Sequence, residues 1–129
     1  MANVLIVDDD VDGCRPLGRL LEVVGHKPFF AHDGNAAIAL LDQCRPDMVL
    51  LDVMMPGVNG LDVLKTIRSH PEFKDLPVVI YSALNDKQTV ERALASGAQN
   101  YLVKSQADFQ TIRHCIESHL AQSGSGQQT

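Results

Sequence analysis

The sequence predicts an α/β fold, in which a parallel sheet of five strands carries helices on both of its faces. Short apolar runs of about four residues recur along the 129-residue chain, and strands of that length are common. Several of these runs are apolar at every position, which is typical of strands covered on both sides. Segments with helical spacing separate the runs, so strands and helices alternate.

The predicted strands are rich in β-branched and aromatic residues. They cover residues 4–7, 28–31, 48–51, 78–81 and 101–103. The first, third and fourth of them are continuously apolar, which indicates strands covered on both faces, as in a parallel sheet. Right-handed crossovers between parallel strands leave few topologies for such a chain.

The first predicted helix follows the first strand. Its apolar stripe consists of Leu17, Leu20, Leu21 and Val24. Gly25 stops it, since glycine readily adopts the left-handed conformation that ends a helix. Proline is tolerated only in the first turn of a helix. Because Pro16 lies near the start, we expect this helix to begin late or to bend near Cys14.

Four further helices lie between and after the remaining strands. Their stripes consist of Ile38 and Leu41; Leu61, Leu64 and Ile67; Val90, Ala93 and Leu94; and Phe109, Ile112, Ile116 and Leu120. Pro46 and Pro71 mark the ends of the second and third helices, and Gly97 marks the end of the fourth. Asp86 is placed to cap the fourth helix. Five strands and five helices are therefore expected.

The composition fits one globular domain, with 45% hydrophobic and 21% charged residues. We expect this domain to span residues 1–121 and residues 122–129, rich in serine, glycine and glutamine, to form a flexible tail or linker. Phe29, Phe30 and Phe109 are expected in the core. The net charge of -5 argues against a nucleic-acid surface, which is usually basic.

The cysteines and the termini indicate a cytoplasmic protein. Cys14, Cys44 and Cys115 are dispersed and odd in number, so we expect buried thiols in a reducing compartment. The first residues lack the pattern of a signal peptide. No apolar run approaches the roughly 20 residues that span a bilayer, so no membrane association is expected.

Polar groups follow four of the five predicted strands, at the point where each strand ends. They are Asp8, Asp9 and Asp10 after the first strand, Asp52 after the third, Ser82 after the fourth and Lys104 after the fifth. In open α/β sheets, ligands bind beyond the carboxyl ends of the strands. Each residue alone has an ordinary explanation as a turn, a helix cap or a solvated amine. Together, at neighbouring strand ends, they predict a functional site.

The chemistry of these groups points to a divalent cation and a phosphoryl group. Two carboxylates about 4 Å apart repel by roughly 4 kcal/mol at an effective dielectric constant of ~20. Lys104 supplies only one positive charge, so a cation is expected. Oxygen ligands favour Mg²⁺, Mn²⁺ or Ca²⁺, and Mg²⁺ suits a site with few carboxylates and a phosphate. A carboxylate nucleophile beside a metal, a hydroxyl and a lysine can transfer a phosphoryl group.

These residues make the chain resemble the receiver domain of two-component response regulators, from about Ala2 to Leu120. The matching motifs are residues 4–10 (VLIVDDD), 50–60 (LLDVMMPGVNG), 80–83 (IYSA), 97–98 (GA) and 101–104 (YLVK). The resemblance implies a flavodoxin-like, doubly wound sheet of strand order 2-1-3-4-5.

The resemblance also implies a role for each site residue. Asp52 corresponds to the phosphoacceptor. Asp9 corresponds to the direct ligand of Mg²⁺ or Mn²⁺ and Asp8 to a ligand acting through water, with Asp52 and the backbone carbonyl of Met54 completing the protein ligands. The donor would be a histidine kinase or a histidine phosphotransfer protein. The domain would turn over no independent substrate, so it would not be an enzyme in the usual sense.

The remaining implied roles concern the switch. Ser82 and the N–H of Ala83 would bind the phosphoryl group, as would Lys104, and Tyr101 matches an aromatic residue that turns inward on activation. The surface of the fourth helix, fifth strand and fifth helix would then bind a downstream target protein or output domain. Homodimerisation through that surface is left open.

The chain departs from the family pattern after Lys104, where a proline usually follows through a cis peptide bond and Ser105 stands here. A cis bond without proline costs ~3 kcal/mol or more. We therefore expect either a trans Lys104–Ser105 bond with a shifted lysine, or a strained cis bond.

Two other functions stay open from the sequence. One is a receiver-like interaction module that no longer accepts phosphate, which Ser105 would explain. The other is a haloacid-dehalogenase-type phosphatase, which also uses an aspartate, Mg²⁺, a hydroxyl and a lysine. In that class the nucleophile ends the first strand and further acids follow the lysine, and this chain has a different order.

Overall fold

The strands and helices alternate along the chain, as expected. A computed structural model describes residues 2–55, 57 and 59–128, with side chains described for 2–55, 57 and 59–121. The strands are β1 (Asn3–Val7), β2 (Lys27–Ala31), β3 (Met48–Leu51), β4 (Val78–Ser82) and β5 (Asn100–Val103). The helices are α1 (Arg15–Val23), α2 (Gly34–Cys44), α3 (Gly60–Ser69), α4 (Lys87–Ala95) and α5 (Phe109–Gln128), with a short 3-10 helix, η1 (Pro71–Phe73), after α3.

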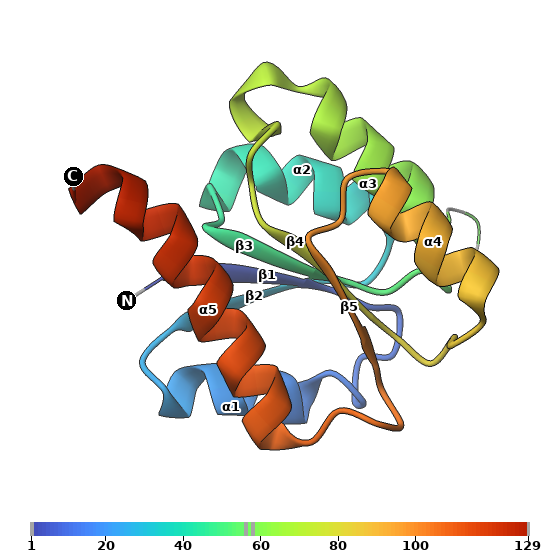
Figure 1. The fold of residues 1–129 in the computed structure, drawn as a ribbon, viewed down its shortest axis with the longest axis horizontal. Helices are drawn as coiled ribbons and strands as arrows, with labels where there is room; N and C mark the ends of the chain where they lie inside the picture. The colour runs from blue at the N-terminus through green and yellow to red at the C-terminus, as the bar shows by residue number, and fades with distance from the viewer. Residues whose placement is uncertain (1, 56, 58, 129) are drawn as a thin grey trace.

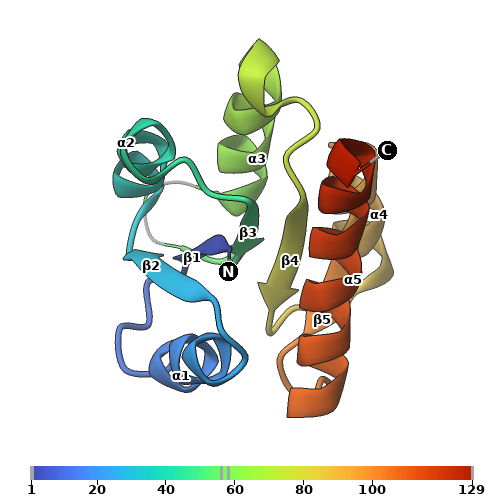
Figure 2. The ribbon, with the colours of Figure 1, turned by 90° about the vertical axis from the view of Figure 1, so that its left-hand side faces the viewer.

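The strands form one sheet in the order β2-β1-β3-β4-β5, and every adjacent pair is parallel. The predicted flavodoxin-like order is therefore confirmed. Helices α1 and α5 cover one face of the sheet, and α2, α3 and α4 cover the other (Figures 1 and 2). β1 lies between β2 and β3, so the chain reverses its direction of winding at β1, where α/β sheets bind their ligands.

Alternate side chains of the central strands enter two separate cores. Leu5, Val49 and Ile80 belong to the core beneath α2, α3 and α4, whereas Ile6 and Leu50 belong to the core beneath α1 and α5. Both faces of β1, β3 and β4 are thus apolar, which explains the uninterrupted hydrophobic runs of the sequence.

The helix boundaries follow the local sequence signals. α1 begins at Arg15 with Pro16 in its first turn, which confirms a late start. Gly25 follows α1 with φ 93°, a conformation that disfavours other residues. Asp86 caps α4 by accepting a hydrogen bond from the backbone N–H of Thr89 at 3.0 Å.

Two phenylalanines expected in the core lie at its margin instead. Phe29 packs partly against the core beneath α2, α3 and α4, but Phe30 is 37% exposed and Phe109 is 60% exposed. Phe30 belongs to the edge strand β2, where its ring lies close to Gly18 of α1. Phe109 is the first residue of α5 and borders an apolar hollow between α1 and α5 that Val23 also lines. The expectation was wrong because β2 is an edge strand and Phe109 is the first residue of α5, so both rings lie at the border of the core.

The boundary between domain and tail stays a prediction. α5 is assigned as far as Gln128. The expected tail, residues 122–129, falls on positions whose side chains lie outside the described residues.

Candidate functional site

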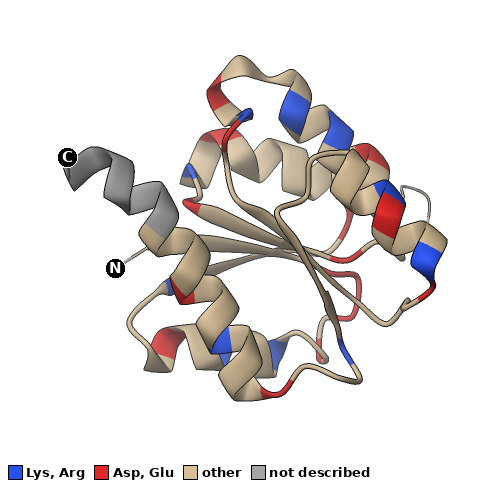
Figure 3. Ribbon diagram, viewed as in Figure 1, with Lys and Arg blue, Asp and Glu red and all other residues tan. Residues whose placement is uncertain are grey.

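Three carboxylates meet where β1 and β3 end. Asp8, Asp9 and Asp52 each offer one oxygen, and these oxygens lie within 4.8 Å of one another. They converge because β1 and β3 are neighbours in register, with Val7 opposite Leu51. Asp8 and Asp52 are buried and Asp9 is exposed. Figure 3 shows acidic stretches gathered beside these two strand ends, with a basic stretch after β5.

The backbone around the acids holds them in place. The N–H of Asp52 donates to the carbonyl of Val7 at 2.9 Å, which continues the pairing of β1 and β3 by one residue. One oxygen of Asp8 accepts from the N–H of Asp10 at 3.0 Å, and one oxygen of Asp52 accepts from the N–H of Met54 at 3.1 Å. Both carboxylates thus cap the turn that follows them, and each keeps a second oxygen for other partners.

Lys104 supplies the positive charge of the site. Its Nζ lies 2.6 Å from Asp8 Oδ2 and 3.1 Å from Asp52 Oδ2, and its side chain is 27% exposed. Burial alone would lower the pKa of Lys104, but its hydrogen bonds and charge interactions with the two aspartates outweigh burial and raise that pKa. The lysine is therefore held as an ammonium group between the two buried acids.

The expected displacement of Lys104 is not observed. The Lys104–Ser105 peptide bond is trans, which is one of the two predicted outcomes, yet the lysine still contacts Asp52. The N–H of Lys104 donates to the carbonyl of Ser82 at 2.8 Å and so continues the pairing of β5 with β4. Lys104 also opens the turn that follows β5, in which the N–H groups of Gln106 and Ala107 both donate to the carbonyl of Val103. The prediction of a shifted lysine was wrong because the backbone bond to Ser82 holds Lys104 beside β4 although the turn begins there.

The donor set of the acid cluster fits a hard divalent cation. All three groups offer carboxylate oxygens, which suit Mg²⁺ or Mn²⁺ better than softer metals. Three carboxylates beside one ammonium group leave negative charge for a cation to neutralise. Met54 follows Asp52 closely enough for its N–H to bind that carboxylate, and the role of its carbonyl as a ligand stays a prediction.

Ser82 lies at the end of β4, opposite Val103 and beside the backbone of Lys104. Its side chain is fully buried, and its Oγ accepts a hydrogen bond from the N–H of Leu84 at 3.3 Å. Ala83 follows on the exposed loop. Within the described part of the chain, no hydrogen bond links Ser82 or Ala83 to the acid cluster, so their binding to a phosphoryl group stays a prediction.

Tyr101 points into the protein from β5. Its hydroxyl donates to the carbonyl of Leu84 at 2.7 Å, and its ring packs against the core beneath α2, α3 and α4. Burial raises the pKa of this hydroxyl. Leu84 is therefore bonded on both sides, by Ser82 through its N–H and by Tyr101 through its carbonyl.

Two residues that contact the site, Gly60 and His32, were not predicted from the sequence. Gly60, the first residue of α3, packs so closely on the backbone carbonyl of Asp52 that a side chain there would collide with it. His32 Nδ1 lies 3.0 Å from the backbone carbonyl of Asp8. The Asn59-Gly60 pair was a usable signal for the start of α3, because asparagine commonly caps helices. In the structure Asn59 Oδ1 accepts a hydrogen bond from the N–H of Leu61 at 2.8 Å.

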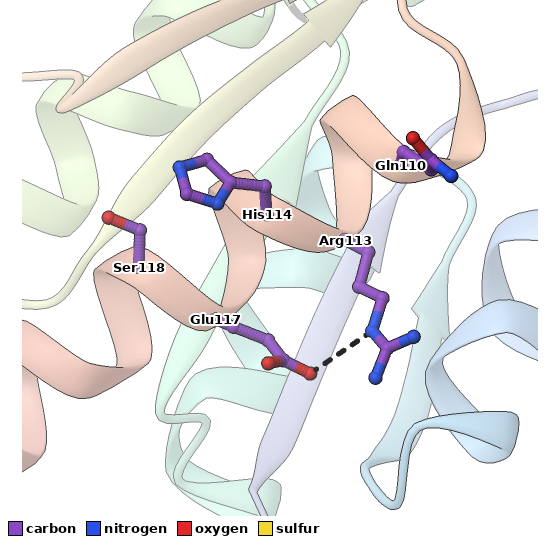
Figure 4. Close-up of a pocket in the computed structure, with 5 residues that line it drawn as sticks. All are labelled: Gln110, Arg113, His114, Glu117 and Ser118. Carbon is purple, nitrogen blue, oxygen red and sulfur yellow. Dashed lines mark ion pairs between the residues drawn. The ribbon is translucent and has the colours of Figure 1, made fainter.

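The surface hollows differ in their chemistry. A hollow of about 420 Å³ adjoins the acids and is lined by Asp9, Val53, Met54, Met55, Asn59 and Leu84. Another lies on the outer face of α5, and its five labelled lining residues come from that one helix (Figure 4). There the charged pair is a solvated one, Arg113 Nε to Glu117 Oε1 at 3.5 Å. The hollow beside Asp9 is therefore the one that belongs to the candidate site.

A parallel sheet of order 2-1-3-4-5, with its polar groups beyond the ends of β1, β3 and β5, defines the flavodoxin-like class of ligand-binding domain. The family model "Response regulator receiver domain" matches residues 4–117. The chain belongs to this family, the receiver domains of two-component signalling.

Curated relatives match this chain over different shares of their own length. Protein PilH of Pseudomonas aeruginosa is 34% identical over 121 residues, which cover 94% of this chain and 99% of PilH. The DNA-binding response regulator MtrA of Mycolicibacterium paratuberculosis is 37% identical over 102 residues, which cover 79% of this chain and 44% of MtrA. The match thus spans nearly all of PilH but less than half of MtrA.

Solved structures share the fold. The chemotaxis protein CheY4 of Vibrio cholerae is 27% identical with a TM-score of 0.85, and the match covers 92% of this chain and 98% of CheY4. A CheY-like receiver domain protein of Methanospirillum hungatei is 18% identical with a TM-score of 0.89, covering 98% of each chain, and supports the fold alone. No helix in the described part of the chain has the length and apolar character needed to cross a membrane.

Proposed function

We propose that this receiver domain accepts a phosphoryl group on Asp52 from the phosphohistidine of a histidine kinase or histidine phosphotransfer protein. One observation carries the proposal. Lys104 bridges Asp8 and Asp52 at 2.6 and 3.1 Å, within a cluster whose three acids offer oxygens within 4.8 Å of one another. The carboxyl-terminal edge of the sheet thus carries a nucleophilic carboxylate, a set of cation ligands and a fixed ammonium group.

In the proposed transfer, a carboxylate oxygen of Asp52 attacks phosphorus. The bond between phosphorus and the donor's imidazole nitrogen breaks, and the imidazole leaves with the bonding electron pair. Asp8, Asp9, Asp52 and the Met54 carbonyl would hold Mg²⁺ or Mn²⁺, which supplies positive charge to the phosphoryl oxygens when bound. Lys104 would stabilise the same oxygens from the other side. The product is an acyl phosphate on Asp52.

The proposed switch runs through Leu84. Ser82 Oγ accepts from the N–H of Leu84, and the Tyr101 hydroxyl donates to its carbonyl. If Ser82 turns its hydroxyl toward a phosphoryl oxygen, with the Ala83 N–H beside it, the bond to Leu84 is lost and the loop is free to adjust. Tyr101 would then transmit the change to the surface of α4, β5 and α5, where a downstream target protein or an output domain would bind.

Phosphoryl acceptance is proposed as the domain's own reaction, without an independent substrate. Met54 and Leu84 flank the site with apolar side chains and line the hollow beside Asp9. Neither can position an attacking water, so slow self-dephosphorylation is expected. We propose that this chain and its phosphohistidine donor both lie in the cytoplasm.

The test is phosphate incorporation from acetyl phosphate with Mg²⁺, followed by intact mass on wild type and Asp52→Asn. The expected result is one adduct of about 80 Da in the wild type, absent from the variant and absent without metal. No adduct despite intact Mg²⁺ binding would favour the receiver-like interaction module. Turnover of a phosphomonoester would instead revive the phosphatase.

A further inference from the structure

An aromatic ring lies beside the ammonium group of the site. Tyr81 of β4 is half-buried and packs against the core beneath α1 and α5. Lys104 Nζ lies 5.6 Å from the centroid of its ring. That separation is within the range of a cation–π contact, in which the negative face of the ring attracts the cation.

The strand register explains why these two side chains meet. Tyr81 is paired with Leu102 across β4 and β5. Side chains alternate between the two faces of a sheet, so Lys104, two residues beyond Leu102, continues on the face that Tyr81 occupies. The ammonium group of the lysine therefore has the tyrosine ring and the two acids as neighbours at once.

We infer that Tyr81 is a positioning residue for Lys104. The ring of Tyr81 keeps the lysine's ammonium group beside Asp52 for contact with an incoming phosphoryl group. The inference rests on the proposed function. Lys104 has two kinds of partner, the carboxylates of Asp8 and Asp52 and the ring of Tyr81. The carboxylates hold it by charge, and the ring holds it without a formal charge of its own.

This difference matters when a divalent cation joins the acids. A cation bound to the carboxylates would compete with Lys104 for Asp8, the acid that the lysine approaches most closely, at 2.6 Å. The attraction of the tyrosine ring for the ammonium group does not depend on those carboxylates. The ring therefore keeps Lys104 within reach of Asp52 when its ion pairs weaken, and a branched aliphatic side chain of similar burial would not.

The test measures how tightly Mg²⁺-loaded protein binds beryllofluoride, a stable analogue of the phosphoryl group, by ¹⁹F NMR. We expect Tyr81→Leu to weaken beryllofluoride binding about five-fold, equivalent to about 1 kcal/mol, the size of a partly exposed cation–π contact. Mg²⁺ affinity should stay within about two-fold, because no hydrogen bond joins Tyr81 to Asp8, Asp9 or Asp52 in the described part of the chain. Tyr81→Phe keeps the ring and should restore wild-type binding.

If Tyr81 acts through Lys104, Tyr81→Leu should cause no further loss of beryllofluoride binding in a Lys104→Met background, where no ammonium group remains. A purely structural role for Tyr81 predicts a loss in that background as well. Equal effects of Tyr81→Leu and Tyr81→Phe, or a loss that persists with Lys104→Met, would overturn the inference. If Tyr81→Leu does not fold, Tyr81→Met makes the same comparison. A wild-type protein that binds Mg²⁺ but neither beryllofluoride nor phosphate would overturn the proposed function itself, and the inference with it.

Discussion

Lys104 Nζ lies 2.6 Å from Asp8 Oδ2, although the two residues are 96 positions apart in the chain. The contact joins the end of β5 to the end of β1 across the ends of β3 and β4. Since the ammonium group also reaches Asp52 at 3.1 Å, it is shared between a predicted metal ligand and the predicted phosphoacceptor. Changes to the charge of this site should therefore have effects of defined sign.

Replacing Lys104 should affect metal binding and stability in opposite directions. Lys104→Met leaves Asp8 and Asp52 buried without their ammonium group, so the free energy of unfolding without metal should fall by about 3 kcal/mol. Mg²⁺ should bind more tightly, because a competing positive charge is gone. Urea unfolding with and without Mg²⁺ checks both effects. Lys65→Met, on the exposed side of α3, is the control, and weaker Mg²⁺ binding by Lys104→Met would contradict the competition.

Gly60→Ala should damage the site without touching a phosphoryl group. The added methyl group would collide with the backbone carbonyl of Asp52, so we expect a loss of about 2 kcal/mol in unfolding free energy and slower phosphate incorporation. Gly18→Ala is a matched control, since its methyl group would meet the ring of Phe30, which is 37% exposed and able to move aside. Equal losses in the two variants would contradict the special role of Gly60.

The lifetime of the acyl phosphate should depend on Met54. Its side chain is 54% exposed and lines the hollow beside Asp9, so a polar replacement is tolerated and can orient a water molecule. Met54→Asn should shorten the lifetime several-fold, as followed by intact mass after removal of the phosphodonor, whereas Met54→Leu should not. Loss of the phosphoryl group from wild type within seconds would count against the apolar explanation.

The three cysteines should be unreactive in the folded protein. Cys14, Cys44 and Cys115 are buried free thiols, and burial raises the pKa of each above its ordinary value of 9.0. At pH 8 we expect Ellman's reagent to label them at least about ten-fold more slowly than in urea, because the thiolate is the reactive form.

The same pKa direction has a consequence for stability. A pKa raised on folding means that the folded protein holds its thiol protons more tightly than the unfolded chain does. The contribution of the thiols to the free energy of unfolding is therefore fully present below pH 9.0, and it is lost as the pH rises through the pKa values of the folded state. Urea unfolding of wild type and Cys115→Ala at increasing pH checks this. A difference between the two proteins that stays constant above pH 9.0 would contradict it.

The strands and their order could be predicted because the sequence carries their signals locally. Residues 48–51 and 78–81 are apolar throughout, which is typical of short strands covered on both faces. The site could be predicted because the carboxyl ends of parallel strands share one edge, which brings Asp8, Asp52 and Lys104 together whatever the details of the loops.

Other features depend on neighbours that the sequence does not identify. The apolar spacing of α5 includes Phe109, yet this residue is the first of the helix and is 60% exposed. The backbone bond of Lys104 to Ser82 is kept at the start of the turn after β5, and Ser105 alone does not reveal this bond. The close approach of Gly60 to Asp52 and the contact of the Tyr81 ring with Lys104 join separate segments, so they appear only in the folded chain.

The span between Asp8 and Lys104 also orders events during synthesis. Asp8, Asp9 and Asp52 emerge from the ribosome well before the lysine, and β5, an edge strand, is synthesised after the other four strands. A nascent chain that lacks β5 would present repelling carboxylates with no ammonium group to offset them. The domain would thus become able to accept a phosphoryl group only when its last strand docks, and a prematurely terminated chain would not accept one.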